Sequence, residues 1–429
     1  MLFIGGIFLR TYQIDERPSI PALIPLSLQH LFAMFGSTVL VPILFGVNPA
    51  TILLMNGIGT LIYIFLCRGQ IPAYLGSSFA FLSPVFLVMA NGSYNQALGG
   101  FIIVGVIFIV VAGIIKVAGS DWIDVVFPPA AMGAIVAVIG LELVPVAAGM
   151  AGIISSDGAA DWSPDRNTII VSMLTLAITI IGNVMFRGFL KIIPILIGII
   201  SGYVIAALFG MVDLQPVRDA KWFALPDFYQ PEFDWTSIVI IAPAALVVIA
   251  EHIGHLVVTQ NIVDRDLMKK PGLGVSLFGN GISTVLSGFV GSTPNTTYGE
   301  NIGVLALTKV YSTWVIGGAA VMAVFLSFFG KLAALISTIP TAVMGGISLL
   351  LFGIIAVSGL RMLVESKVDY SKTTNMILTT IVLVIGLSGT TFTWGYLQLK
   401  GMALATVIAI LLSLFFALIH KLKLSNDHE

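Results

Sequence analysis

The stretch 291-GSTPNTTYGENIGVLALTK-309 decides the fold, because it places a turn-rich run directly before a short apolar segment. The segment 298–308 is too short to cross a hydrocarbon core of ~30 Å as a helix. The run 69-GQIPAYLGSS-78 leads into a second short segment, 76–90. A helix that begins at membrane depth leaves its first N–H groups unpaired and presents the positive end of its dipole. We therefore predict two half-helices, beginning near Ser78 and Gly299, whose amides point toward a polar ligand with carbonyl oxygens.

The composition of the whole chain agrees with a membrane setting. Hydrophobic residues make up 58% of the 429 positions and charged residues only 10%, and the mean hydropathy is +1.05. A soluble domain carries roughly a quarter charged residues, because water must solvate its surface. The net charge of −1 argues against nucleic acid as a partner. The single cysteine, Cys67, excludes an intrachain disulfide and a cysteine-based metal cluster.

Apolar stretches separated by short polar, glycine or proline breaks follow one another from Pro21 to Ile419. We count fourteen and predict an all-α polytopic membrane protein with fourteen transmembrane segments. The segments lie near 21–45, 48–67, 76–90, 97–115, 128–148, 167–185, 192–211, 237–260, 273–291, 298–308, 312–330, 339–358, 374–389 and 401–420.

The basic residues orient these segments. With both termini in the cytoplasm, fifteen of the 20 Lys and Arg residues fall on the cytoplasmic side. The other five are Arg166, Arg218, Lys221, Lys331 and Lys400. The positive-inside rule predicts this asymmetry, so we expect a multi-pass protein surrounded by the lipid bilayer, with both termini in the cytoplasm.

The two halves of the chain repeat each other. Four motifs recur in the same order: Gln29-His30 with Glu251-His252, 56–60 with 280–284, the runs at Gly76 and Gly299, and 129–133 with 340–345. Seven segments per copy is an odd number, so the second copy inserts upside down. Inverted repeats with interrupted helices in matching positions indicate a secondary transporter whose site lies near the midplane.

Ionisable side chains within membrane segments are costly, about 2.5–3.5 kcal/mol each at the centre of an inserted helix, so each needs a reason. Glu251 and His255 are four residues apart and share one helical face. They are either an internal pair that locks helices together or a site of binding and protonation, and we favour the second. An imidazole such as His255 titrates near physiological pH, which suits proton coupling.

Glu300 opens the tenth, interrupted segment. An acidic residue in a first turn complements the helix dipole, but this explains poorly a glutamate at membrane depth, so we favour a functional role. For His30 and His252, structural hydrogen bonds are at least as good an explanation as ligand contact. Glu142 lies near a segment end, and we expect it to reach the interface.

Two other functional classes are open to these residues. The run 251-EHIGH-255 has two histidines and a glutamate, but the zinc motif H-E-x-x-H needs its histidines four apart with the glutamate directly after the first. We therefore expect no metal, no cofactor and no enzymatic activity. A channel or facilitator is the stronger rival, although channels commonly use symmetric subunit rings or lined pores.

The stretch 300-ENIGVLALTK-309 fits the signature of the nucleobase/ascorbate transporters (nucleobase–cation symporter type 2): Gln, Glu or Pro, then Asn, any residue, Gly, four of any, Thr, and Arg, Lys or Gly. Gln29-His30 fits the second motif of that family. The runs 74–81, 128–143, 247–259 and 291–303 resemble the bacterial uracil permeases of this family. The resemblance covers nearly the whole chain from about Pro21 onward.

This resemblance implies a fold of two kinds of domain, with short antiparallel strands in segments three and ten. A core domain comprises residues 21–116 and 237–330, and a gate domain comprises residues 128–211 and 339–420. It implies a homodimer that associates through the gate domains, and transport by rocking of core against gate.

The resemblance also implies the site residues and the substrate. The expected function is symport of uracil with protons, with xanthine or another nucleobase as the alternative substrate. Glu251, Glu300, Phe79, Gly299 and Tyr298 are the expected uracil contacts, the first two through carboxylates and Phe79 and Gly299 through backbone amides. His255 and Glu300 are the expected proton-coupling residues. His30, Gln29 and Asn301 are the expected polar network.

Overall fold

The computed structural model describes residues 3–4, 7–8, 10–90, 92–155 and 162–425. The described residues are mostly helical and form two compact units, each assembled from three separate parts of the chain. The first unit comprises Met1–Ser77, Leu143–Tyr229 and Thr297–Phe352, and the second comprises Ser78–Glu142, Gln230–Thr296 and Gly353–Glu429. This division follows the density of contacts within the chain. The predicted core and gate domains are a different division and stay a prediction.

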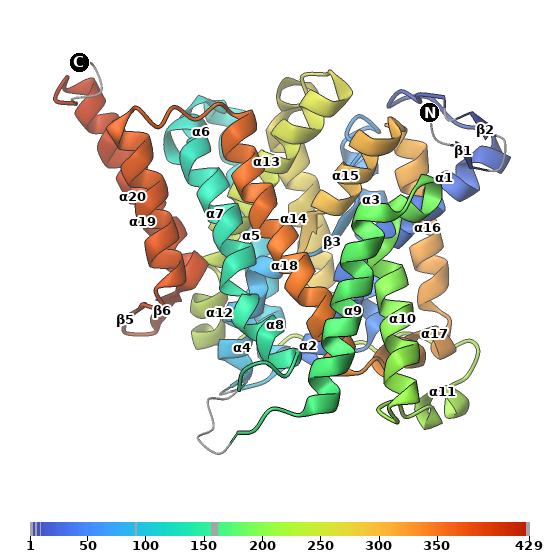
Figure 1. Ribbon diagram of the computed structural model, residues 1–429. Helices are drawn as coiled ribbons and strands as arrows, with labels where there is room; N and C mark the ends of the chain where they lie inside the picture. The colour runs from blue at the N-terminus through green and yellow to red at the C-terminus, as the bar shows by residue number, and fades with distance from the viewer. Residues whose placement is uncertain (1–2, 5–6, 9, 91, 156–161, 426–429) are drawn as a thin grey trace. The chain divides into compact units, whose positions relative to one another are not determined.

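Helices dominate both units (Figure 1). Those of the first are α1 (Ile20–Ala33), α2 (Phe35–Phe45), α3 (Pro49–Leu66), α8 (Val144–Met150), α9 (Arg166–Met185), α10 (Pro194–Leu208), α11 (Gln215–Asp219), α15 (Gly299–Thr308), α16 (Thr313–Ser327) and α17 (Gly330–Ser337), with the turn η2 (Gly188–Ile192). Those of the second are α4 (Leu82–Met89), α5 (Tyr94–Ala118), α6 (Asp121–Val126), α7 (Pro129–Glu142), α12 (Trp235–Ile241), α13 (Ala244–Val263), α14 (Leu273–Val290), α19 (Thr373–Leu387) and α20 (Gly401–Lys421), with the turns η1 (Phe79–Phe81) and η3 (Met268–Gly272). Helix α18 (Thr341–Glu365) contributes residues to both units.

The described residues contain nine helical stretches long and apolar enough to cross a membrane. They are Ile20–Phe45, Pro49–Leu66, Tyr94–Ala118, Pro129–Met150, Arg166–Met185, Trp235–Val263, Met268–Val290, Thr341–Glu365 and Gly401–Lys421. Four shorter apolar helices are Phe79–Met89, Pro194–Leu208, Thr313–Ser327 and Thr373–Leu387, and α15 has only ten residues. A helix therefore lies in each of the fourteen predicted stretches, while the number of membrane crossings stays a prediction.

Local sequence sets several helix boundaries. Asn48 caps α3, because its side chain accepts a hydrogen bond from the Ala50 N–H and Pro49 occupies the first helical position. Ser93 begins α5 with a reciprocal capping box to Gln96. In the predicted eighth segment, α12 ends at Ile241 and α13 begins after Pro243, which has no N–H to donate.

In the first unit, α3 packs along α16, and glycine makes the approach close. A Cβ added to Gly57 would lie 2.7 Å from the carbonyl oxygen of Ala320 on α16. No side chain larger than hydrogen fits at that position without moving a backbone. Small residues that let helix backbones approach are typical of helix packing in membranes.

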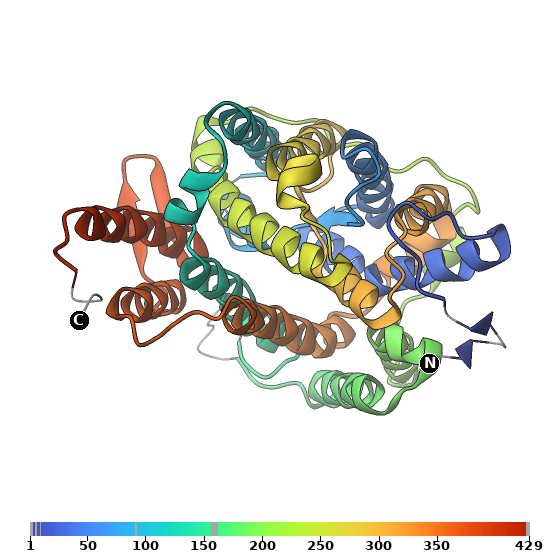
Figure 2. The ribbon, with the colours of Figure 1, turned by 90° about the horizontal axis from the view of Figure 1, so that it is seen from above.

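In the second unit, α5 packs along α14 in a similar manner. A Cβ on Gly281 would lie 2.9 Å from the carbonyl oxygen of Gly105, and one on Gly105 would lie 2.8 Å from that of Gly281. The two helices therefore meet backbone to backbone. The pair α19 and α20 also lies side by side in this unit (Figures 1 and 2).

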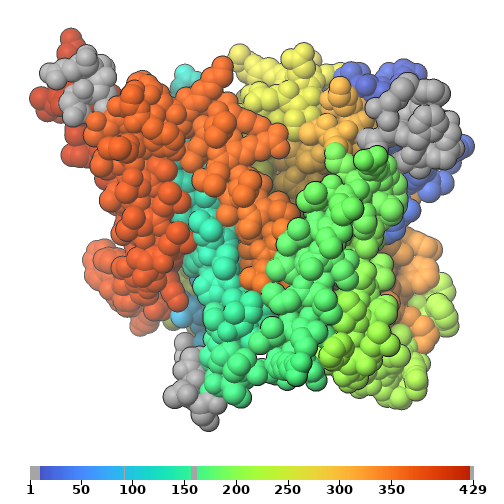
Figure 3. Space-filling view, viewed as in Figure 1, coloured from blue at the N-terminus to red at the C-terminus, as the bar shows by residue number. Residues whose placement is uncertain are grey.

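Outward-facing surfaces of several helices are apolar. On α9, which lies uncovered in the space-filling view (Figure 3), Val184 and Met185 are 78% and 68% exposed. On α20, Leu411, Phe415 and Leu418 are also exposed. Lipid is a favourable solvent for such faces, because exposing contiguous apolar surface to water is unfavourable.

The two interrupted stretches contain the short strands predicted for them. Strand β3 (Leu75–Ser77) runs into η1, and β4 (Asn295–Thr297) runs into α15. In the first unit the Thr60 hydroxyl accepts a hydrogen bond from the Leu75 N–H at 2.9 Å. In the second, the Thr284 hydroxyl accepts one from the Asn295 N–H at 3.1 Å. A threonine on the preceding long helix thus holds the first residue of each strand.

Two further sheets were not predicted from the sequence. One is the antiparallel pair β1 (Phe3–Ile4) and β2 (Ile7–Phe8), and the other is a hairpin before α20. Strands β5 (Thr391–Trp394) and β6 (Leu397–Lys400) form an antiparallel hairpin with Thr391 opposite Lys400, in a stretch left as a connection between segments. Gly395 adopts φ +59° in its two-residue turn, a conformation that favours glycine.

Removing either threonine hydroxyl should destabilise the protein. Thr60→Val and Thr284→Val keep the side-chain shape but leave a buried strand N–H without its acceptor, which costs ~1–3 kcal/mol. We expect a lower Tm for both variants in detergent. Thr406→Val is the control, because the buried Thr406 hydroxyl donates only to the Met402 carbonyl of its own helix. Equal Tm values for all three variants would contradict this role.

Candidate functional site

Half-helix α15 begins at Gly299 with Tyr298 in the capping position, and its first turn contains Glu300. The half-buried carboxylate accepts a hydrogen bond at 2.7 Å from the hydroxyl of Ser37 on α2. Ionised carboxylates offer about four acceptor positions, so this bond orients the group and leaves acceptor capacity. The helix N-terminus beside it carries N–H groups that have no partner within their own helix.

The ring of Tyr298 packs inside the first unit. It stacks on Tyr74 with ring centroids 6.5 Å apart and an angle of 21° between the planes. A Cβ on Gly76 would lie 2.2 Å from the nearest ring atom of Tyr298, so glycine at position 76 makes room for the ring. The Tyr298 N–H donates to the Tyr74 carbonyl at 2.9 Å. Its predicted role beside the ligand stays a prediction.

Helices α1 and α15 contain the predicted polar network. The Asn301 amide lies 3.2 Å from Nδ1 of His30 and donates to the His30 carbonyl at 3.0 Å. Both residues are buried. The structure thus brings His30 and Asn301 together, and this contact ties α15 to α1. Gln29 is buried next to them, and its Nε2 atom has no hydrogen-bond partner among the described residues.

In the second unit, Glu251 lies on α13 and is 9% exposed. Its Oε2 accepts a hydrogen bond at 3.1 Å from the hydroxyl of Thr296 in β4. A strand residue of the interrupted stretch therefore positions this carboxylate, as an α2 residue positions Glu300.

The two histidines of α13 differ in their surroundings. His252 is buried, and its Nε2 lies 2.7 Å from the Ser276 hydroxyl on α14, which agrees with the structural alternative raised for it. His255 is half-buried and follows Glu251 by one helical turn. The two residues therefore share one face of α13.

Phe79 begins η1, the start of the other half-helix. Ser78 caps this turn by accepting a hydrogen bond from the Ala80 N–H at 3.3 Å, and its own N–H donates to the Pro294 carbonyl at 3.0 Å. The Phe79 side chain is 7% exposed. Half-helices therefore begin at Phe79 and Gly299, the first one residue after the predicted starting point near Ser78 and the second at the predicted one.

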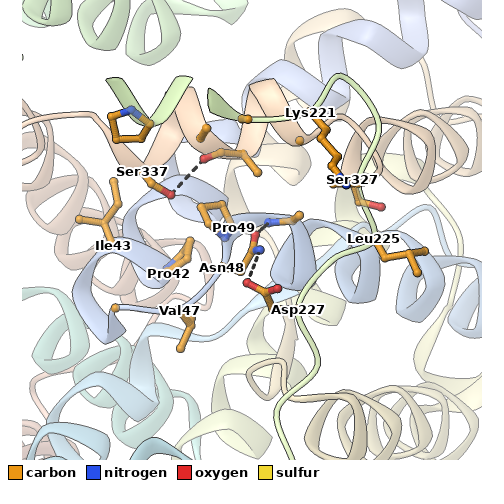
Figure 4. Close-up of a pocket in the computed structure, with 18 of the residues that line it drawn as sticks. Pro42, Ile43, Val47, Asn48, Pro49, Lys221, Leu225, Asp227, Ser327 and Ser337 are labelled. Carbon is orange, nitrogen blue, oxygen red and sulfur yellow. Dashed lines mark hydrogen bonds between the residues drawn. The ribbon is translucent and has the colours of Figure 1, made fainter. Parts of the chain in front are cut away.

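A cavity of about 630 Å³ lies elsewhere in the first unit (Figure 4). It contains none of the predicted site residues, and its lining comes from the α2–α3 turn, the loop before Tyr229, and α17. Asn48 donates to the Asp227 carboxylate at 2.7 Å and its N–H donates to the Tyr229 hydroxyl at 2.9 Å. Burial raises the pKa of the Tyr229 phenol. These bonds hold the loop over the start of α3.

Among the residues that the structure describes, no group of three or more His, Cys, Asp or Glu side chains is placed to hold a metal ion. Glu142, on α7, accepts a hydrogen bond from the Met402 N–H at 2.8 Å in the first turn of α20. It therefore caps a helix N-terminus, where negative charge is favourable.

The chain is similar in sequence to proteins of one known family. A family model described as "Permease family" matches residues 21–395. The chain belongs to this permease family. It is 68% identical over 418 residues to a protein named uracil permease from Paenibacillus larvae, with 97% of this chain and 99% of that one covered. It is 63% identical over 414 residues to the Escherichia coli K12 protein of the same name, with 96% of each covered. The resemblance found in the motifs is confirmed, and this permease is a multi-pass membrane protein.

A solved structure shares the fold. The transmembrane domain of the cyanobacterial bicarbonate transporter BicA matches this permease with a TM-score of 0.63 at 15% identity, covering 95% of this chain and all of that one. At that identity the likeness concerns the fold alone.

The sequence analysis missed the residues that hold the two carboxylates of this permease. Ser37 and Thr296 are buried hydroxyl residues in apolar or turn-rich surroundings, and such residues are common in membrane helices. Thr60 and Thr284 were visible as the last letters of a repeated motif, but the motif alone did not show what their hydroxyls bind.

Proposed function

We propose that this permease carries uracil across the bacterial cytoplasmic membrane. The observation that carries the proposal is the identity to relatives named uracil permease over nearly the full length of both chains. Family membership alone leaves the substrate open, and Glu300 at the first position of the signature supports uracil over xanthine.

The chemistry of uracil suits the residues proposed to bind it. Uracil has ring N–H donors and carbonyl acceptors in one plane. A carboxylate only accepts hydrogen bonds, so Glu251 and Glu300 are the proposed acceptors of the ring N–H groups. The half-helix N-termini at Phe79 and Gly299 are the proposed donors to the carbonyls, since helix N-termini favour negative charge. Tyr298 completes the proposed set.

Uptake is proposed to be coupled to protons through Glu300 and His255. A carboxylate that ionises in a partly desolvated site is costly. Protonation and substrate loading then favour each other, because the coupling between two binding events is reciprocal. The imidazole of His255, one turn from Glu251, is the second proposed proton carrier.

Inverted repeats of seven segments each are the proposed basis of alternating access. Under this proposal each part of the first unit corresponds to one part of the second: Met1–Ser77 to Gln230–Thr296, Leu143–Tyr229 to Gly353–Glu429, and Thr297–Phe352 to Ser78–Glu142. Two backbone hydrogen bonds fit the same correspondence: the Ser78 N–H donates to the Pro294 carbonyl, and the Tyr298 N–H donates to the Tyr74 carbonyl. The two donors, Ser78 and Tyr298, are 220 positions apart, and so are the two acceptors, Tyr74 and Pro294. The threonines that hold β3 and β4 support the same correspondence.

Under this proposal the core domain (21–116 and 237–330) rocks against the gate domain (128–211 and 339–420). Association of two copies through the gate domains belongs to the same proposal, and native mass spectrometry would test it as twice the chain mass.

Both termini are proposed to face the cytoplasm, because fifteen of the 20 basic residues then lie inside. Reporter fusions after Lys423 and in the loop before Arg166 should report opposite sides of the membrane. The same side for both would show that the number of segments is wrong.

Vesicles that contain the purified protein should take up labelled uracil faster when an inward proton gradient is imposed, and xanthine should be a poor substrate. His255→Ala is the matched variant, expected to retain uracil binding while losing most of the response to the gradient. Uracil uptake that ignores the gradient in the wild type would favour a facilitator. Xanthine uptake at the rate of uracil would favour a broader nucleobase carrier.

Glu300→Gln should weaken uracil binding while leaving α15 intact, since size and helix propensity barely change. An amide replaces a charged acceptor, and the lost charge-assisted bond is worth ~1.5–3 kcal/mol, or roughly ten- to a hundred-fold in affinity. Calorimetry on the folded protein measures this. Glu142→Gln, a matched change at a helix cap outside the proposed site, should leave the affinity within about two-fold. An unchanged affinity in Glu300→Gln would return Glu300 to a helix-dipole role.

A further inference from the structure

Helix α14 has three different faces. Gly274, Gly281 and Gly288, seven residues apart, lie against α5, where an added Cβ on each would come within 3.3 Å of atoms of that helix. Val275, Phe278, Leu286 and Phe289 are exposed apolar residues on a second face. The third face, at 100° per residue, contains Ser276, Asn280, Ser283 and Ser287. All four are buried at 0% exposure. A polar, fully buried stripe on an apolar membrane helix needs an explanation.

Both ends of this polar stripe are hydrogen bonded within the second unit. At one end the Ser276 hydroxyl lies 2.7 Å from Nε2 of His252. At the other end the Asn295 amide donates to the hydroxyls of Ser283 and, at 3.1 Å, Ser287. Thr296, next to Asn295, donates to Glu251. The stripe therefore runs between the histidine of α13 and the strand that positions the proposed ligand carboxylate.

Asn280 lies in the middle of the stripe and is different. Neither its Nδ2 nor its Oδ1 has a hydrogen-bond partner among the described residues. A buried polar group without a partner costs ~1–3 kcal/mol, and an amide carries two donors and an acceptor. Buried water typically occupies such positions, making about three hydrogen bonds to otherwise unsatisfied groups.

The spacing of the stripe fits bridging water. Residues three and four apart on a helix have Cβ atoms ~5–6 Å apart. Ser276 precedes Asn280 by four residues and Ser283 follows it by three. Two hydrogen bonds through one water span a similar distance, and a serine hydroxyl can both donate and accept hydrogen bonds.

The corresponding helix of the other repeat has no such stripe. Asn280 corresponds to Asn56 on α3, whose Nδ2 donates to the Thr38 hydroxyl at 3.4 Å, while its Oδ1 has no hydrogen-bond partner among the described residues. The serines 276, 283 and 287 correspond to Ile52, Gly59 and Tyr63. The polar stripe is thus confined to the repeat that also contains Glu251 and His255.

We propose that Asn280 binds internal water that links Ser276 to Ser283, so that α14 has a hydrated face inside the second unit. Resting on the proposed proton-coupled uptake, this water lies one hydroxyl, that of Ser276, from Nε2 of His252, which precedes the proposed proton carrier His255 by three residues on α13. The hydrogen-bonded chain from the water through Ser276 orients the His252 ring and fixes which of its nitrogens carries the proton. No net proton moves along the stripe, because its other end is the Asn295 amide. Asn280 is a positioning residue that does not touch uracil.

Radiolytic hydroxyl labelling of the wild-type protein tests the water directly, because radicals formed from bound water modify buried side chains near it. Leu277 on α14 and Leu53 on α3 are a matched pair, the same residue type at corresponding positions and buried at 0% and 3% exposure. We expect Leu277 to be labelled at least roughly five-fold faster if internal water lies beside Asn280. Equal slow labelling of the two leucines would overturn the proposal.

Asn280→Leu keeps the side-chain volume and removes all of its hydrogen-bonding atoms. We expect Leu277 labelling to fall to the rate of Leu53, uracil binding to stay within about two-fold, and gradient-driven uptake to fall about ten-fold. Asn280→Ser retains a hydroxyl for water and should preserve both labelling and uptake, which also guards against a folding defect in the leucine variant. Wild-type uptake that does not depend on the proton gradient would contradict the proposed coupling. The labelling of Leu277 tests the water site independently of that result.

Discussion

The structure depends on one constraint: backbone N–H and C=O groups buried in an apolar protein must find partners inside it. Two stretches of this chain leave the helical state in its interior, at β3 and β4. Their first N–H groups are satisfied by the hydroxyls of Thr60 and Thr284. After β3, the Ser78 N–H donates to the Pro294 carbonyl. After β4, the Tyr298 N–H donates to the Tyr74 carbonyl. Once these bonds are made, the half-helices after each strand have a definite starting point.

The carboxylates follow from those starting points. Glu300 lies in the first turn of α15 because that helix begins at Gly299, and Ser37 then orients it. Glu251 is oriented by Thr296, a residue of β4 itself. In both cases a neutral hydroxyl donates to the carboxylate and orients it. Under the proposed function, a carboxylate oriented in this way accepts hydrogen bonds from the ring N–H groups of uracil.

Glycine and small side chains determine how closely the long helices approach. The contacts of Gly57 with α16 and of Gly281 with α5 are the same kind of contact at corresponding positions of the proposed repeats. Under the proposed correspondence, α3 and α14 differ in one buried face. Positions 52, 59 and 63 of α3 are Ile, Gly and Tyr, and the corresponding positions 276, 283 and 287 of α14 are all serine. Close glycine contacts occur on both helices, and the serine stripe occurs on α14.

The two short strands were expected only from the family resemblance. The sequence by itself determined the membrane setting, the helix in each of the fourteen stretches, and the starting points of the half-helices near Ser78 and Gly299. These features depend on composition, segment length and turn residues, which are local properties of the chain. Only the tertiary structure decided which hydroxyls hold Glu251 and Glu300, that Asn301 bonds His30, that Glu142 caps α20, and that Asn280 lies in a buried polar stripe. It also revealed the β5–β6 hairpin, which the connection before α20 did not suggest. Such contacts join residues far apart in the chain, in one case 271 positions, and serine, threonine and asparagine are too common in membrane helices for their partners to be assigned before the helices are packed.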